Sequence, residues 1–210
     1  MKTSADPARK IKLYAGTATW LWLASIVAWW IDRPGFLYLV RPPEILRRLP
    51  GNGFVYGFCA AVVGGMLAQT VLVRVNPKFK VIYQRQMAKL GFFLPVTAGE
   101  RAWFAVVSVS AGICEEVLYR GFLYHSFADF WHWSVIAGLI AAAAFFGLGH
   151  GYQGVTGILT TGILGGVLSL IYLSTGSLLA PMILHAVLDL RILLFPRIRR
   201  RAETISASAT

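Results

Sequence analysis

Acidic side chains are scarce in this chain. Only 9 of its 210 residues are Asp or Glu, and charged residues of both signs make up 14% of the sequence. An average soluble domain has about 25% charged residues. Hydrophobic residues reach 57%, and the mean hydropathy is +0.63. This composition argues against an ordinary soluble globular domain and predicts an integral membrane protein.

Several common catalytic and binding motifs are also missing. The 2 cysteines, Cys59 and Cys114, lie in different apolar runs and form no CxxC pair, which argues against a disulfide framework. The sequence contains no HExxH or GxSxG motif, and no Walker or dinucleotide-binding glycine pattern. A nucleotide-binding fold of the usual kind is therefore not expected.

Long runs without charge predict an all-α fold, a polytopic transmembrane helical bundle. A span needs about 20 apolar residues, and turn signals at 151–154 and 174–177 divide the longest run. The six predicted spans are about 13–31, 54–73, 102–124, 133–151, 154–173 and 177–195. The segment 78–94 mixes basic and apolar residues and predicts an interfacial amphipathic helix. We expect a single integral-membrane domain, 1–210, with its motif-bearing core at about 100–195.

Basic residues are distributed unevenly along the chain, which has a net charge of +11. They cluster at the N-terminus, in the connection 74–101 and in the C-terminal tail. The positive-inside rule then predicts a multi-pass protein of the cell membrane with both termini cytoplasmic, and we expect this membrane to be the bacterial inner membrane. A basic face beside anionic lipids accounts for the net charge, so we expect the lipid bilayer and not nucleic acid as the partner.

The most informative polar residues are Glu115 and Glu116, which lie inside a predicted span. A charge in hydrocarbon costs several kcal/mol, so intramembrane ionisable residues usually mark a functional site. Glu116 and Arg120 stand at i and i+4 and are predicted to pair on one helical face. Glu115 is rotated by about 100° from Glu116 and is left to act as a candidate general base.

Two further polar clusters lie in later spans. His150 is flanked by glycines, which let backbones approach closely and free the ring to enter a cavity. His185 and Asp189 are again four residues apart, so the aspartate is predicted to fix the imidazole tautomer. We expect Glu115, His150 and His185 to converge on one hydrolytic site. By the predicted topology, however, His150 would lie about 10 Å from Glu115 in depth, unless its span starts deeper or breaks at the glycines.

Three motifs in this order resemble those of the CPBP family, the CAAX proteases and bacteriocin-processing enzymes also called the Abi family. Residues 115–120 fit its EExxxR motif, 146–150 fit FxxxH, and 185–189 fit HxxxN or HxxxD. The family includes the Ras-converting CAAX endopeptidase, and the resemblance covers about residues 100–195.

The resemblance implies a glutamic-type intramembrane endopeptidase without a cofactor. Glu115 would be the general base and would activate a water together with His150, while Glu116 and Arg120 would orient the site. The implied partner is a membrane-anchored or lipidated protein or peptide substrate.

The same resemblance assigns His185 and position 189 to stabilising the oxyanion of the tetrahedral intermediate. The Ras-converting branch has asparagine where this chain has Asp189. An ionised aspartate would repel an oxyanion, so Asp189 is expected to orient His185 or to be protonated.

Three other interpretations stay open at this level. Glu115, His150 and His185 are ligand types that suit a catalytic zinc with one open position for water. A second alternative is a transport protein that relays protons through its Glu, His and Asp groups. A third is a non-catalytic immunity protein of the membrane.

Overall fold

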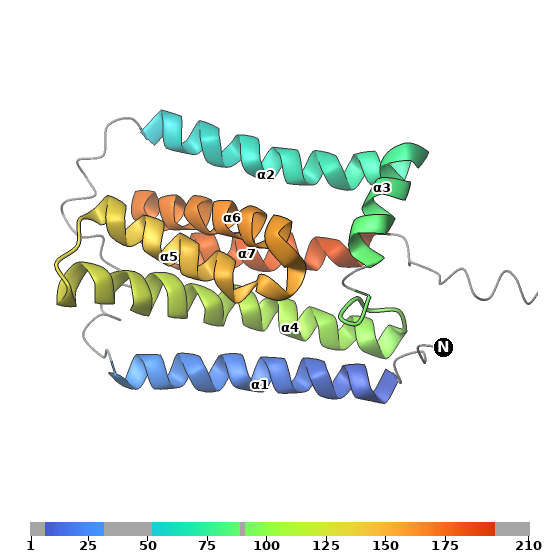
Figure 1. Cartoon of the computed structure of the whole chain (residues 1–210), viewed down its shortest axis with the longest axis horizontal. Helices are drawn as coiled ribbons and strands as arrows, with labels where there is room; N and C mark the ends of the chain where they lie inside the picture. Colours follow the sequence, from blue (N-terminus) through green and yellow to red (C-terminus); the bar gives the residue numbers. More distant parts are fainter. Residues whose placement is uncertain (1–6, 32–51, 89–90, 196–210) are drawn as a thin grey trace, which may run out of the picture.

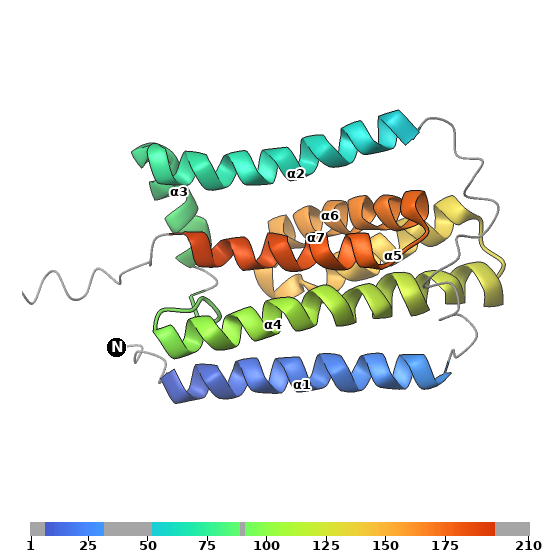
Figure 2. The ribbon, with the colours of Figure 1, turned by 180° about the vertical axis from the view of Figure 1, so that it is seen from behind.

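The chain folds into a bundle of α-helices. The computed structural model describes residues 7–31, 52–88 and 91–195, and over these ranges it contains helices, turns and no strand. Six helices lie side by side, and a seventh, α3 (Pro77–Ala88), crosses one end of the bundle, here called the α3 end (Figures 1 and 2). The predicted all-α fold is confirmed. The six are α1 (Pro7–Ile31), α2 (Asn52–Val75), α4 (Ala98–Glu116), α5 (Val135–Gly149), α6 (Gly154–Thr175) and α7 (Leu179–Leu190).

The apolar helices identify a multi-pass membrane protein. Three helical segments are long and apolar enough to cross a membrane: Pro7–Ile31, Ala98–Ala128 and Gly151–Thr175. Two shorter apolar helical segments are Val63–Val75 and Val135–Gly149. The total of six spans stays a prediction. The basic residues at 196–201, which support the predicted orientation, lie outside the described residues.

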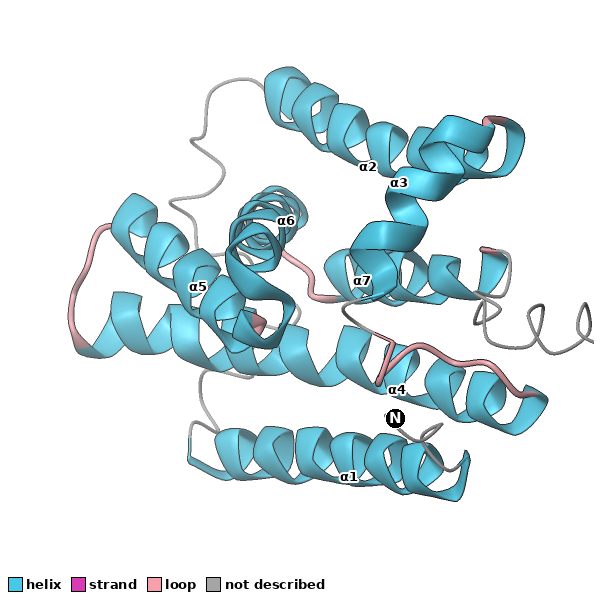
Figure 3. Ribbon diagram, turned by 45° about the vertical axis from the view of Figure 1, so that its right-hand side comes forward, coloured by secondary structure: helices cyan, strands magenta, loops and turns pink. Residues whose placement is uncertain are grey.

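Helix α4 lies between the other helices, with α1 on one side and α5, α6 and α7 on the other (Figure 3). It begins with a capping box, in which Thr97 accepts from the Glu100 backbone N–H and Glu100 accepts from the Thr97 N–H. Gly112 permits the close approach of α7, because a Cβ on Gly112 would lie only 2.7 Å from the backbone nitrogen of Ala186. This contact fixes the register of α7 against α4.

The predicted span 102–124 lies within the apolar helical segment Ala98–Ala128, but much of its second half is not α-helical. The α-helix ends at Glu116 and continues as two π-helical segments, η3 (Val117–Leu123) and η4 (Ser126–Phe130). A π-turn contains more residues than an α-turn and is found most often at functional sites. Periodicity alone does not reveal this change, because the apolar pattern continues through it. The wider turns carry Arg120, whose guanidinium bonds to α6.

Helix α5 is too short to reach the α3 end. Its 15 residues rise about 22 Å, less than the roughly 30 Å of a bilayer core. The turn from α5 to α6, which includes the 3-10 segment η5 (Gly151–Gln153), lies beside the middle of α4 (Figure 1). Gly147 packs closely on α6, since a Cβ there would lie 2.6 Å from the carbonyl oxygen of Ile158 and 3.1 Å from Gly162.

The α3 end is held by polar contacts to backbone carbonyls. Helix α7 continues as a short 3-10 segment, η6 (Arg191–Leu194), and Arg101 donates to the Leu193 oxygen at 2.6 Å. Arg74 of α2 donates through Nε to the Leu194 oxygen at 3.1 Å. Lys10 of α1 donates to the Leu94 oxygen at 2.8 Å. Within the predicted interfacial segment 78–94 the structure has the shorter helix α3, with residues 91–94 forming a turn instead, and its place at a membrane interface stays a prediction.

Candidate active site

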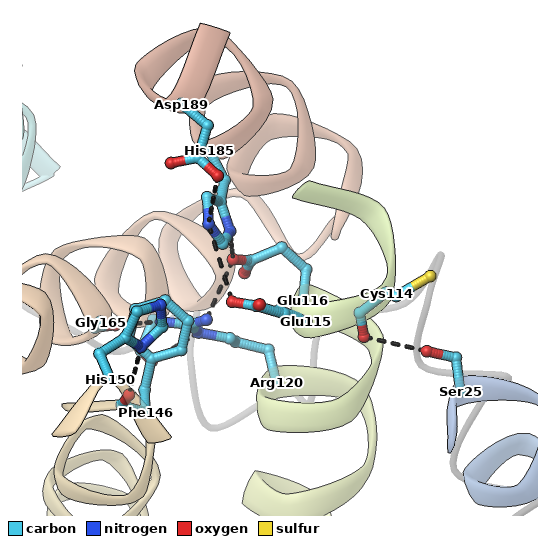
Figure 4. A network of polar contacts seen from close by, with 11 residues as sticks. Ser25, Cys114, Glu115, Glu116, Arg120, Phe146, His150, Gly165, His185 and Asp189 are labelled. Atoms are coloured by element: carbon cyan, nitrogen blue, oxygen red, sulfur yellow. Dashed lines mark hydrogen bonds and ion pairs between the residues drawn. The ribbon is translucent and has the colours of Figure 1, made fainter. Parts of the chain in front are cut away.

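Glu116 is the centre of a buried polar network (Figure 4). It is the last residue of α4 and is fully buried, so its carboxylate needs partners. Its Oε1 accepts from Arg120 Nη1 at 3.0 Å and lies 2.8 Å from His185 Nδ1. The predicted pair between Glu116 and Arg120 is therefore confirmed, and a third member, His185, joins it from α7.

Arg120 is held from three sides. Its Nη2 donates to the Gly165 carbonyl oxygen at 2.6 Å, and its Nε donates to Ser169 Oγ at 3.2 Å. The guanidinium carbon also lies 4.7 Å from the centre of the Phe146 ring, within cation–π distance. With Glu116 on Nη1, this buried cation connects the end of α4 to α6 and fixes the Glu116 carboxylate in place. Sequence reasoning did not identify Gly165 or Ser169, since a carbonyl and one serine in an apolar helix carry no motif.

His185 is oriented by Glu116 and not by Asp189. The predicted hydrogen bond from Asp189 is replaced by the 2.8 Å contact between His185 Nδ1 and Glu116 Oε1. Asp189 Oδ2 lies 3.8 Å from the other ring nitrogen, Nε2, which is beyond hydrogen-bond distance. The cause is the packing of the two helices. Helices α4 and α7 approach so closely at Gly112 that the Glu116 carboxylate lies within hydrogen-bond distance of the His185 ring. Nε2 is left facing the two remaining carboxylates.

Glu115 faces the same imidazole nitrogen. Its Oε2 lies 3.9 Å from His185 Nε2, and within the described part of the chain this buried oxygen has no hydrogen-bond partner. The Glu115 side chain is 16% exposed and the Asp189 side chain 38%, while Glu116 and His185 are almost completely covered. The two carboxylates that flank Nε2 thus lie on the more open side of the network.

His150 lies at the C-terminal cap of α5, and its tautomer follows from one contact. Nδ1 lies 2.8 Å from the Phe146 carbonyl oxygen. A carbonyl oxygen can only accept, so Nδ1 carries the proton and Nε2 of the neutral ring keeps a free lone pair. Glu115 and Asp189 both interact electrostatically with His150. The three motifs meet around Phe146 and Glu116, because Phe146 packs against both imidazoles and Glu116 contacts His185, while the direct approach of His150 to Glu115 stays a prediction.

Phe146 packs against several side chains of the site. The sequence identified it only as the first residue of the FxxxH motif. Its ring packs against both imidazoles, with centroid distances of 4.8 Å to His150 and 5.6 Å to His185. It also contacts the Tyr119 ring at 5.1 Å. One aromatic ring thus fixes the relative positions of His150, His185 and Arg120 (Figure 4). An apolar residue four positions before a histidine is its only sequence signal.

Both imidazoles of the zinc alternative already use one ring nitrogen for a contact within the protein. His185 uses Nδ1 for Glu116, and His150 uses Nδ1 for a carbonyl, so each ring has only Nε2 to offer. Across residues 7–31, 52–88 and 91–195, no three His, Cys, Asp or Glu side chains are grouped so that they could hold a metal ion. Metal-binding histidines usually hold their second ring nitrogen in contacts of this kind, so the contacts of the two imidazoles do not exclude zinc, and the zinc alternative stays a prediction.

The fold and the site together define an α-helical membrane protein with a buried Glu, His and Arg network open at one side. Comparison with protein-family models found a match to the type II CAAX prenyl endopeptidase Rce1-like family over residues 97–204. The chain belongs to this family of membrane proteases, as its three motifs predicted. Comparisons with curated proteins and with solved structures found no match.

Proposed function

We propose that this chain is a glutamic-type intramembrane endopeptidase that hydrolyses a peptide bond of a membrane-anchored or lipidated protein. One observation carries the proposal most strongly. Glu115 Oε2 is buried without a hydrogen-bond partner in the described structure, and it lies 3.9 Å from one imidazole in a site shared with another. A buried carboxylate with unused hydrogen-bonding capacity costs stability, which suits a group that binds a reacting molecule.

In the proposed first step, Glu115 and the free Nε2 of His150 bind one water molecule. Glu115 removes a proton from this water as it attacks the carbonyl carbon of the substrate. His150 accepts a hydrogen bond from the same water through the lone pair that its contact with Phe146 leaves free. Glu115 then returns the proton to the leaving amine, so the cycle balances without another acid.

His185 is proposed to stabilise the tetrahedral oxyanion. Its Nδ1–H is directed to Glu116, so its Nε2 donates only when the ring is an imidazolium. Three carboxylates, those of Glu115, Glu116 and Asp189, interact with this ring and favour the positive charge. Glu116 and Arg120 act as positioning residues, because they hold the ring but do not face the open side. Asp189 is proposed to balance the imidazolium charge, and not to donate to the oxyanion.

The direct test is Glu115→Gln, which keeps size and hydrogen bonding but cannot accept the proton. General-base catalysis contributes about 10²–10⁴-fold, so proteolysis of a lipidated reporter should fall by at least 100-fold with unfolding unchanged. The matched control is Glu100→Gln, a buried glutamate at the other end of the same helix, which should retain activity. Activity of Glu115→Gln within about tenfold of the parent would remove Glu115 from this role, whereas absence of proteolysis by the parent itself would favour a non-catalytic or proton-relay protein.

A second experiment addresses the metal. We expect the purified protein to hold far less than one zinc per chain after mild chelation and to remain active. Stoichiometric zinc, with activity lost to a chelator and restored by Zn²⁺, would support a zinc-dependent intramembrane metalloprotease instead.

A further inference from the structure

The proposed mechanism leaves the tetrahedral oxyanion with one hydrogen-bond donor, Nε2 of His185. Sites that stabilise an oxyanion usually direct more than one donor at the oxygen on which the charge develops. Asp189 lies 3.8 Å from His185 Nε2, but an ionised carboxylate only accepts hydrogen bonds. A second donor would therefore have to come from another residue on the open side of the network.

Tyr152 lies close to this side of the site. It belongs to η5, two residues after His150, and the centroids of the two rings are 5.9 Å apart. Its phenol interacts electrostatically with Glu115 and Asp189, the two carboxylates that flank His185 Nε2. The residue is 56% exposed, so its hydroxyl is accessible to a bound substrate.

The contacts of Tyr152 hold its ring and its oxygen and leave its proton available. The hydroxyl oxygen accepts a hydrogen bond from Gln153 Nε2 at 3.1 Å. The ring packs edge to face on Phe92, with a centroid distance of 6.4 Å. A phenol is un-ionised at neutral pH and carries one proton to donate. Within the described part of the chain, no hydrogen bond from this proton to a protein acceptor is observed.

A second tyrosine near the site has different surroundings. Tyr119 belongs to the π-helical segment η3, and its ring packs against Phe146 at 5.1 Å. Its hydroxyl oxygen lies against the backbone of α5, since a Cβ on Gly149 would be only 2.8 Å from it. Its phenol interacts electrostatically with Glu115 and with the buried Arg120. Tyr119 therefore lies toward the closed side of the network, whereas Tyr152 lies toward Asp189 and the open side.

We propose that the Tyr152 hydroxyl is the second donor to the tetrahedral oxyanion, together with His185 Nε2, and that Gln153 is a positioning residue for it. This proposal rests on the proposed function and adds a catalytic residue to the same site. The phenol keeps its proton throughout, so the step needs no further acid or base. The hydrogen bond becomes stronger as the carbonyl oxygen gains negative charge, and it therefore stabilises the transition state more than the bound substrate.

Tyr152→Phe removes the hydroxyl and keeps the ring that packs on His150 and Phe92. Loss of one oxyanion donor typically lowers kcat by about 10²–10³-fold. In the full-length protein in detergent micelles, kcat for a farnesylated reporter peptide should fall by about 100-fold, with KM within about threefold of the parent. A residue that only packs against the substrate would change KM instead.

A tetrahedral inhibitor provides a readout that a structural role would not change. The probe is the same farnesylated peptide with a phosphinate in place of the scissile amide, which presents a negative oxygen on a tetrahedral phosphorus. Its inhibition constant should rise in Tyr152→Phe by the factor by which kcat/KM falls, because both report the same donor. An unchanged inhibition constant would overturn the proposal, since the hydroxyl would then act on His150 or on another part of the substrate.

The matched control is Tyr119→Phe, which deletes another phenol hydroxyl near Glu115 and should keep kcat within about threefold. Gln153→Leu removes the group that orients the Tyr152 oxygen. A single hydrogen bond of this kind contributes modestly, so kcat should fall by about three- to tenfold. In the Tyr152→Phe background, Gln153→Leu should cause no further loss, because it acts through the hydroxyl that is already absent.

A fall in kcat of less than about tenfold in Tyr152→Phe, an equal fall in Tyr119→Phe, or additive effects of the changes at 152 and 153 would overturn the proposal. If Tyr152→Phe does not fold, Gln153→Leu decides, and an unchanged inhibition constant for the phosphinate in that variant would overturn it. Failure of the parent protein to cleave the reporter would contradict the proposed function and, with it, this role of Tyr152. An active parent with a fully active Tyr152→Phe variant would contradict only the role of Tyr152.

Discussion

Two interfaces of α4 each bury a glutamate beside a basic side chain. They differ in whether the buried carboxylate oxygens all have hydrogen-bond partners. At the interface with α1, Glu100 Oε2 accepts from the Val96 and Thr97 backbone N–H groups and lies 3.7 Å from Lys10 Nζ. At the interface with α7, Glu116 uses one oxygen for two partners, and its Oε2 has none within the described residues. Glu115 beside it also has an unpartnered oxygen.

The difference shows that burial of a charge does not by itself mark a functional site. Among the described residues, neither oxygen of Glu100 is both buried and without a hydrogen-bond partner, and its Oε2 caps a helix beside one cation. In the Glu116 cluster, by contrast, Oε2 of Glu115 and Oε2 of Glu116 are buried and receive no hydrogen bond from any described residue. Unused capacity inside a buried network is therefore the better indication of where a substrate or water binds.

The largest expected effect comes from breaking the Glu116 network. Arg120→Met should leave the Glu116 carboxylate buried without its cation, and loss of one partner of a buried pair typically costs about 3–5 kcal/mol. Equilibrium unfolding in mixed micelles measures this loss. A destabilisation below about 1 kcal/mol would show that the network is not the stabilising core of the α4–α6 contact.

An intermediate effect is expected from separating α4 and α7. A side chain on Gly112 would collide with the Ala186 backbone, and overpacking typically costs about 1–3 kcal/mol. Gly112→Val should therefore lower stability and also reduce proteolysis, because Glu116 would no longer reach His185. Gly16 of α1 has open space around it, so Gly16→Val is the control for adding a valine to an apolar helix. Similar activity losses in both variants would contradict a specific role for the α4–α7 contact.

A smaller effect is expected at the α1 interface. Lys10→Met removes the donor to the Leu94 oxygen, but Glu100 keeps its two backbone donors. We expect a loss of about 1 kcal/mol in the free energy of unfolding, with catalysis retained. A loss as large as that of Arg120→Met would remove the distinction between the two interfaces.

The smallest effect is expected for Ser25→Ala, which deletes one hydrogen bond from α1 to the Cys114 carbonyl oxygen at 3.2 Å. A neutral hydrogen bond contributes about 0.5–1.5 kcal/mol, and this one lies at the weak end by its length. Cleavage should be unchanged even though Cys114 directly precedes Glu115. A clear fall in the cleavage rate at unchanged stability would show that α1 positions the catalytic glutamate.

Much of the fold followed from composition and run length. Uncharged stretches of about 20 residues predict membrane-spanning helices, because a helix forms all the hydrogen bonds of its backbone N–H and C=O groups within its own segment. The pairing of Glu116 with Arg120 followed from their i, i+4 spacing, which survives the change to π-helix. The meeting of Glu115, His150 and His185 was expected because few other partners exist for these groups inside the spans.

The errors concern features that periodicity does not encode. The shift to π-helix after Glu116 interrupts an apolar run that looks continuous, whereas the end of α5 at Gly149 lies close to the predicted limit at 151. The predicted bond between Asp189 and His185 failed for a similar reason. Spacing places two residues on one face of a helix, but a neighbouring helix can supply a closer acceptor.

The sequence by itself determined the helical membrane fold and the set of ionisable residues that must share a buried environment. Only the tertiary structure decided which atoms of these residues meet. Gly112 and Gly147 let α7 and α6 approach to backbone contact, and this sets the helix register that brings Glu116 to His185 and His150 to the depth of Glu115. Periodicity fixes the face on which a side chain lies, but the relative height of two helices depends on close packing between residues far apart in the chain.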